Sequence, residues 1–158
     1  MSPLADALIS AGPIAEHAEA MALYGWLVGR WDLDITVYDQ DIRRLTGWMA
    51  ADWVLDGRAV QDVWHAEGFF HGTTLRVYDP AIDAWHIQWT APQLGIRLTQ
   101  LGTADPEGIV QDGTLPDGSA IRWSFRDIGP DAFRWRDERS RDGSTWQVYQ
   151  EYRAARVS

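Results

Sequence analysis

The sequence predicts an all-β protein, an antiparallel up-and-down barrel of about ten strands with an N-terminal helix. Two observations support this prediction. Apolar and polar residues alternate along many short segments, as in Trp85–Thr90, so each segment has one face suited to burial. Turn-forming Asp-Gly and Pro-Asp-Gly sequences recur between these segments, as at Asp56-Gly57 and Pro116-Asp117-Gly118. Such turns join antiparallel strands.

The segments between these turns define the expected strands. They are Trp31–Tyr38, Thr46–Leu55, Ala59–His65, Thr73–Tyr78, Trp85–Thr90, Ile96–Thr103, Ile109–Leu115, Ala120–Asp127, Ala132–Ser140 and Trp146–Arg156. No helical segment separates them, as a parallel sheet would require. An open meander of this size would expose two long edges, and closure into a barrel removes both. A two-sheet sandwich is the alternative, but it usually needs longer crossing connections.

The first 29 residues follow a helical period instead. Apolar residues recur at helical spacing from Ile14, after Pro13, and Gly25 or Gly29 can end the helix. We therefore expect residues 1–29 to form a helical segment that packs on or closes the barrel, and residues 30–158 to form a single barrel domain. In the sequence GWLVGRWDLDI, where the period changes, Trp31 is expected to plug the end of the barrel and Trp26 to join the helix to it.

Composition excludes several classes of function. The net charge of −9 disfavours nucleic acid and anionic membrane surfaces as partners. All 14 basic residues are arginine, which excludes a Schiff-base lysine, and the absence of cysteine excludes thiolate chemistry. The N-terminus lacks the basic stretch of a signal peptide, and no apolar run is long enough to span a membrane. We expect a cytoplasmic protein.

Several short motifs resemble known barrel proteins. Gly29-Arg30-Trp31 resembles the Gly-x-Trp motif of the calycin superfamily, which includes lipocalins and fatty-acid-binding proteins. The stretches Ala51–Arg58, Tyr78-Asp79-Pro80 and Asp142–Arg153 resemble lipocalin-like bacterial proteins of the DUF1579 type. The resemblance implies a barrel with an internal pocket. The similar nitrobindins bind haem through a histidine near the chain end, but no histidine follows His86 here, so no cofactor is expected.

A barrel of about ten strands is too wide for its own side chains to fill completely. Several aromatic residues share the face expected to point inward, and they would form an aromatic-walled cavity suited to a small hydrophobic, aromatic or polycyclic ligand. The expected ligand-binding residues are Trp85, Trp89, Trp123, Phe125, Trp135, Trp146 and Gln150. The alternative is that these residues simply fill the barrel.

A few polar residues share the same parity. Asp137, Arg139, His71 and Tyr152 would be the catalytic groups if the protein were a cofactor-free cyclase or isomerase acting on an apolar substrate. A structural ion pair at the barrel rim is the alternative for Asp137 and Arg139. In the lipocalins a terminal arginine stacks on the Gly-x-Trp tryptophan, so Arg139 or Arg153 is expected to cover Trp31 and help close the barrel.

Two weaker signals remain. The sequence HAEGFFH, with His65, Glu67 and His71, matches no strong zinc pattern and fits a solvated hairpin tip better than a metal or acid–base site, so no metal is expected. Tyr38, Tyr149 and Trp53 are expected on the outer face, where exposed aromatic residues can mark a homodimer interface.

Overall fold

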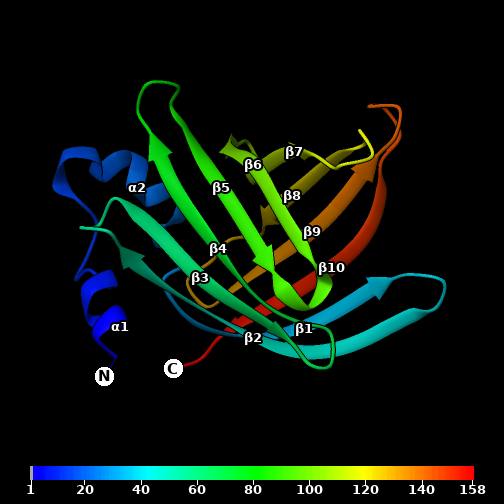
Figure 1. Ribbon diagram of the computed structural model, residues 1–158, viewed down its shortest axis with the longest axis horizontal. Coiled ribbons are helices and arrows are strands. Elements are labelled where there is room, and N and C mark those ends of the chain that lie inside the picture. Colours follow the sequence, from blue (N-terminus) through cyan, green and yellow to red (C-terminus); the bar gives the residue numbers. More distant parts are fainter. Residues whose placement is uncertain (1) are drawn as a thin grey trace.

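A computed structural model, which describes residues 2–158, is a closed antiparallel barrel with short helices at one end (Figure 1). Each strand pairs with its sequence neighbours, and β1 also pairs with β10, which removes both sheet edges. The predicted fold class is confirmed, and the sandwich alternative is excluded. The strands are β1 (Gly29–Tyr38), β2 (Ile42–Val54), β3 (Ala59–Ala66), β4 (Phe70–Asp79), β5 (Ala84–Ala91), β6 (Ile96–Asp105), β7 (Gly108–Thr114), β8 (Ala120–Arg126), β9 (Ala132–Ser140) and β10 (Gln147–Arg156).

The helical segment lies beside one end of the barrel. It comprises α1 (Pro3–Leu8), the 3₁₀ turn η1 (Ala15–His17) and α2 (Ala18–Gly25), and a further 3₁₀ turn, η2 (Pro92–Leu94), joins β5 to β6 at the opposite end. Met21 and Tyr24 of α2 are buried in the barrel core. No helix in the described part of the chain combines the length and apolarity needed to cross a bilayer.

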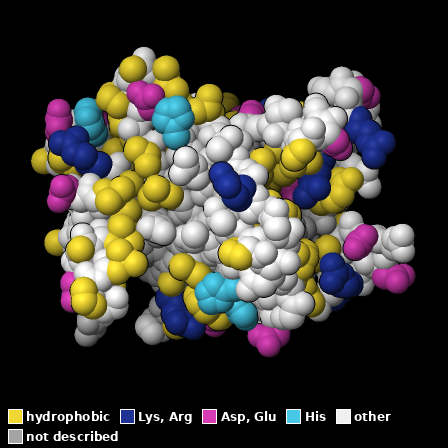
Figure 2. Space-filling model, viewed as in Figure 1, with side chains coloured by type: hydrophobic (Ala, Val, Ile, Leu, Met, Phe, Trp, Pro, Cys, Tyr) yellow, Lys and Arg dark blue, Asp and Glu magenta, His cyan; other side chains and the backbone are white. Residues whose placement is uncertain are grey.

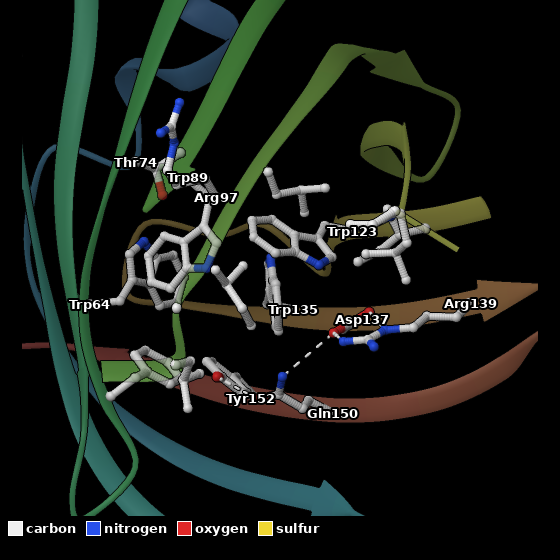
Figure 3. A pocket seen from close by; sticks show the side chains of 18 of the residues that line it. Trp64, Thr74, Trp89, Arg97, Trp123, Trp135, Asp137, Arg139, Gln150 and Tyr152 are labelled. Atoms are coloured by element: carbon white, nitrogen blue, oxygen red, sulfur yellow. Dashed lines mark hydrogen bonds and ion pairs between the residues drawn. The ribbon is translucent and has the colours of Figure 1, made fainter. Parts of the chain in front are cut away.

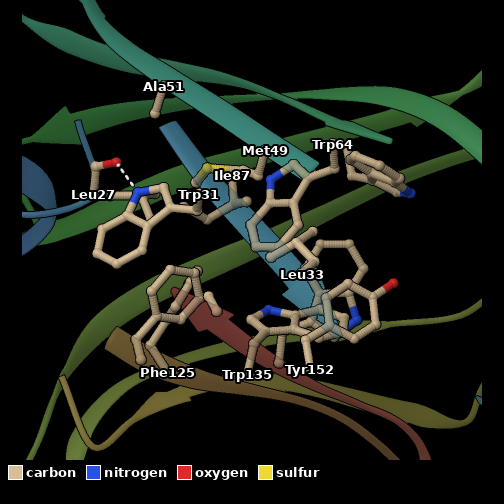
Figure 4. Close-up of a cluster of buried hydrophobic side chains, with 14 of the residues drawn as sticks. Leu27, Trp31, Leu33, Met49, Ala51, Trp64, Ile87, Phe125, Trp135 and Tyr152 are labelled. Atoms are coloured by element: carbon tan, nitrogen blue, oxygen red, sulfur yellow. Dashed lines mark hydrogen bonds between the residues drawn. The ribbon is translucent and has the colours of Figure 1, made fainter. Parts of the chain in front are cut away.

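Aromatic side chains fill the end of the barrel beside α2. Figure 4 shows Leu27, Trp31 and Phe125 at this end of a buried cluster that continues to Trp135 and Tyr152. Trp31 is fully buried, and its indole donates a 2.9 Å hydrogen bond to the Leu27 carbonyl. The Trp26 and Phe133 rings lie edge-to-face with Trp31, at centroid distances of 6.2 and 4.8 Å. Edge-to-face pairs combine large apolar burial with favourable quadrupole geometry. The expected plugging role of Trp31 is thus consistent with its position.

The arginine that covers Trp31 is Arg156, whose guanidinium carbon lies 4.0 Å from the Trp31 ring centroid. The same guanidinium donates hydrogen bonds to the carbonyls of Val28 and Trp26, at 2.9 and 2.8 Å. Our assignment of this contact to Arg139 or Arg153 is wrong. Arg156 lies beside Trp31 because β1–β10 pairing places these two residues opposite each other.

A layer of polar side chains crosses the middle of the barrel. Asp62 and Arg76, both 1% exposed, form an ion pair between β3 and β4. Arg76 Nε also donates to Gln111 Oε1 at 3.2 Å, and the Tyr24 hydroxyl donates to the same oxygen at 2.7 Å. Burial raises the pKa of Tyr24, so its hydroxyl stays a donor. Buried charges persist only when paired and hydrogen-bonded in this way.

Breaking this ion pair should destabilise the whole barrel. Arg76→Met leaves the Asp62 carboxylate buried without its partner, so we expect a loss of about 3–5 kcal/mol of unfolding free energy. The double variant Asp62→Leu/Arg76→Met removes both charges and should recover most of that loss. Guanidinium denaturation measures both values. A double variant no more stable than Arg76→Met would contradict this account.

Candidate functional site

The barrel is open at the end away from α2, where it holds a cavity of about 210 Å³ (Figure 3). The loops β5–β6 and β7–β8 border its mouth through Leu94, Gly95, Leu115 and Pro116. Its walls are mainly aromatic: Trp64, Phe70, Trp89, Trp123, Trp135 and Tyr152. The barrel is therefore packed at one end and hollow at the other, with Arg76 in the cavity floor.

The aromatic wall rings meet in edge-to-face and tilted contacts. The Trp123 ring lies 5.9 Å from Trp89 and 5.2 Å from Trp135, at interplanar angles of 78° and 63°. Trp135 also contacts Tyr152 at 4.5 Å. These contacts hold each ring by its neighbours, so the wall is preorganised rather than assembled around a ligand.

Gly72 of β4 determines where Trp89 can lie. A Cβ atom at this position would meet the Trp89 ring at 2.4 Å, closer than any real side-chain contact. A residue other than glycine would therefore push the indole aside. The missing side chain at Gly72 lets the Trp89 ring lie against β4 on the cavity wall.

One side of the cavity is polar and centres on Asp137, which is 1% exposed. Arg139 Nη2 and Nε donate to the Asp137 carboxylate at 3.2 and 3.4 Å, and Gln150 Nε2 donates to it at 3.4 Å. Burial raises the pKa of Asp137, despite the opposing attraction of Arg139. The arginine offsets only part of the desolvation because its bonds are long and its side chain is 31% exposed.

Tyr152 completes this polar side through Gln150. The Tyr152 hydroxyl donates a 2.7 Å hydrogen bond to Gln150 Oε1, which orients the Gln150 amide toward Asp137. Burial, followed by the nearby Asp137 charge, raises the pKa of Tyr152 well above its ordinary value. Tyr152 is therefore a fixed hydrogen-bond donor and not a base.

The Trp123 indole N–H also faces this carboxyl, and its attraction opposes part of the rise that burial causes in the pKa of Asp137. The contact does not reach normal hydrogen-bond geometry, so this buried nitrogen has no regular hydrogen bond among residues 2–158, and Trp123 is only 8% exposed. The closed end differs, because Trp26 and Trp31 both donate to backbone carbonyls. A buried donor without a well-formed hydrogen bond is costly.

The expected ligand-binding residues divide among three places. Trp89, Trp123, Trp135 and Gln150 line the cavity. Trp85 and Phe125 instead belong to the packed end, where each lies edge-to-face with Tyr24, at centroid distances of 4.9 and 6.2 Å.

Trp146 lies outside the barrel, so our placement of it on the inward face is wrong. Its ring is covered by the guanidinium of Arg122, which pairs with Asp112 on the outer surface. The reason is an irregularity in the β9–β10 register between Val148 and Gln150, which reverses the facing of the residues before it. Gln150 and Tyr152, after the irregularity, point inward as expected.

His71 is exposed on the outer surface, and its expected inward position is also wrong. The inward positions of β4 are Phe70, Gly72, Thr74 and Arg76, so Leu75 and Val77 face outward. Arg76 is charged and yet points inward, where it pairs with Asp62. The charged residues of this strand therefore do not identify its outer face. His71 instead lies beside His65 on the outside, at a ring distance of 5.2 Å. No three metal-ligating side chains converge anywhere in residues 2–158.

The outer aromatic residues make contacts within the chain. The Tyr38 hydroxyl donates to Glu151 at 3.0 Å, and the Arg139 guanidinium lies 4.3 Å from the Tyr149 ring centroid. Trp53 does not lie on the outer face; it is 8% exposed and packs beneath Gly25 of α2. The parity of Trp53 matches the inward Met49 and Ala51 of the same strand.

Sequence reasoning missed several residues that line the cavity, among them Trp64, Phe70, Arg76 and Arg97. The alternation in β3 could have indicated Trp64, but Val63 gives the opposite face an apolar residue too. Arg97 lines the cavity near its mouth and is exposed, and no ion pair within residues 2–158 involves it. Figure 2 shows hydrophobic and basic side chains together on the half of the molecule away from the helices.

The sequence matches no protein-family model and no curated protein. A solved structure, from the DUF3598 family of Nostoc punctiforme PCC 73102 and of unknown function, is similar at 8% sequence identity and TM-score 0.26. The match covers 87% of this chain and 99% of that chain. A TM-score of 0.26 does not establish a shared fold between the two chains.

The raised pKa of Asp137 predicts a pH-dependent stability. Between the ordinary aspartate pKa and the raised folded-state pKa, the folded protein binds more protons than the unfolded chain, so the unfolding free energy falls as pH rises. Asp137→Asn removes this dependence. The stability of the wild type relative to Asp137→Asn should therefore decrease across that window in urea denaturation. A difference that is flat or increases with pH would contradict the raised pKa.

Proposed function

We propose that this protein binds a small, flat aromatic molecule in the cavity at the open end of the barrel. The observation that carries the proposal is a cavity of about 210 Å³ walled by four tryptophans, Trp64, Trp89, Trp123 and Trp135. Ligand sites are typically apolar and aromatic cavities with a few placed polar groups. The Asp137 side of the wall supplies such groups.

The volume narrows the class of ligand. Typical ligand cavities measure roughly 300–1,000 Å³, so 210 Å³ favours a molecule of one or two rings. A long-chain fatty acid or haem would need more room than the packed end leaves, because the Asp62–Arg76 layer forms the floor. The expected ligand is therefore smaller than the polycyclic molecule that tryptophan content alone suggested.

The fold also supports the proposal that a ligand binds inside the barrel. A closed antiparallel barrel with a helix at one end, a Gly29-x-Trp31 motif and an arginine on that tryptophan agrees with the calycin resemblance. Calycin-like barrels hold ligands in the lumen. We propose that this chain is a lipocalin-like barrel of that kind; the narrower DUF1579 resemblance rests on the sequence motifs alone.

Binding is favoured over catalysis by the groups at the cavity. His71 lies outside the barrel, and the strongly raised pKa of Tyr152 removes it as a base. Asp137 is the one carboxyl among the lining residues, and Arg139 and Gln150 already engage it. A single carboxyl without a second acid–base group offers limited chemistry.

Titration with small aromatic compounds tests the proposal. We expect naphthalene or coumarin to quench tryptophan fluorescence and raise the melting temperature, while palmitate and haem do neither. Trp89→Leu should weaken binding about tenfold, since it removes one aromatic wall contact. The matched control is Trp146→Phe, which changes a tryptophan outside the barrel and should leave affinity unchanged. Absence of binding by every one- and two-ring compound tried would refute the proposal.

A further inference from the structure

The wall of the barrel has a gap in its strand pairing beside the mouth of the cavity. The pairing of β4 with β5 ends at Thr73 and Thr90, so the residues Phe70–Gly72 pair with β3 alone. The chain after β5 forms η2, which packs against β4 at this gap. There the backbone N–H of His71 donates a 3.2 Å hydrogen bond to Gln93 Oε1. A side-chain oxygen thus replaces the strand carbonyl that would accept this bond in a continuous ladder.

The aromatic walls of the cavity are nearly inaccessible from outside. Each of the six wall rings is between 3 and 8% exposed: Trp64, Phe70, Trp89, Trp123, Trp135 and Tyr152. An aromatic ring compound is much larger than water, so it needs a wider mouth than these side chains leave. A segment at the mouth must therefore move before a ligand enters. Most lining residues belong to paired strands, and four belong to loops: Leu94, Gly95, Leu115 and Pro116.

Of the two loops at the mouth, the one that contains η2 is held more loosely. In the β7–β8 loop, the Leu115 N–H donates to the Ser119 carbonyl at 2.9 Å, and the Ser119 N–H donates to Asp117 Oδ1 at 2.9 Å. The η2 loop has an internal backbone bond donated by Gly95, and the Gln93 side chain fastens it to β4. The Gln93 bond is exposed to solvent, so water replaces it with a small net change in free energy.

We infer that η2 is the gate of the cavity and that the hydrogen bond from the His71 N–H to Gln93 Oε1 is the latch that keeps it closed. This inference rests on the proposed function and adds the route by which the ligand enters. Opening breaks no β4–β5 pairing, because that ladder ends before η2 begins. Gly95, at φ 65°, is the hinge, since glycine changes its backbone angles readily. No atom beyond its chain neighbours lies within 4 Å of the position that a Gly95 Cβ would take.

A latch of this kind affects the rates of binding and not the affinity. Gln93 is not among the residues that line the cavity, so it does not contact a ligand held there. Its hydrogen bond is present while the gate is closed, with or without ligand, and is broken while a ligand passes. Removing the bond therefore raises the association and dissociation rate constants by the same factor, and their ratio, the Kd, stays the same.

Stopped-flow quenching of tryptophan fluorescence by coumarin measures both rate constants. Gln93→Ala should raise each of them about fivefold, the effect of one ordinary hydrogen bond, with the Kd changed by less than about twofold. Gln93→Ser, too short to reach His71, should do the same, whereas Gln93→Glu keeps an acceptor oxygen and should stay near the wild type. The matched control is Gln88→Ala, at an exposed glutamine on the outer face of β5, and it should change neither rate. Asp117→Ala, which loosens the β7–β8 loop, should also change neither rate.

Each outcome decides the inference. Unchanged rates in Gln93→Ala and Gln93→Ser overturn the gate, while the proposed function stands because coumarin still binds. Faster dissociation with a weakened affinity also overturns it, since η2 would then be part of the binding wall. Faster rates in Asp117→Ala alone overturn it in favour of a gate in the β7–β8 loop. If no one- or two-ring compound binds the wild type, the proposed function fails, and the gate fails with it.

Discussion

The buried pair of Asp62 and Arg76 separates the two halves of this barrel. On one side Arg76 lies against Tyr24 and Phe125, with guanidinium-to-ring distances of 5.2 and 5.7 Å, and on the other it forms the floor of the cavity. A charge pair excluded from water must be held on all sides, so it requires the packed end behind it. The Asp62–Arg76 pair therefore forms a fixed floor for the hollow end and leaves the cavity above it open.

Tryptophan has different surroundings in the two halves of the barrel. In the packed end, Trp31 meets a carbonyl acceptor, an arginine and two aromatic rings, so every part of its side chain is satisfied. In the hollow end, Trp123 is packed by neighbouring rings, and its N–H faces the Asp137 carboxyl without a regular hydrogen bond. The tryptophans of the packed end stabilise the core, and those of the hollow end form the cavity wall.

The strand number and barrel closure were predictable because alternation and turn residues are local signals. The inward faces were predictable wherever apolar residues marked them, as at Trp89, Trp123 and Trp135. Prediction failed at β4, where a charge that pairs across strands occupies the inward face, and at Trp146, where a register irregularity reverses the facing. Arg156 could not be distinguished from Arg153 because the partner of Trp31 depends on long-range register. The ion pair, the register irregularity and the β1–β10 register all depend on contacts between strands, so the sequence of one strand does not reveal them.

Pairing of the first strand with the last also bears on how the protein is made. β1 leaves the ribosome early and must wait for β10, and the guanidinium that covers Trp31 belongs to the final residue of β10. Until that residue is available, β1 presents an unpaired backbone edge to other nascent chains. Contacts of such large sequence separation also make barrel closure intrinsically slow. A chain shortened by a few residues at this terminus would therefore be expected to aggregate during synthesis.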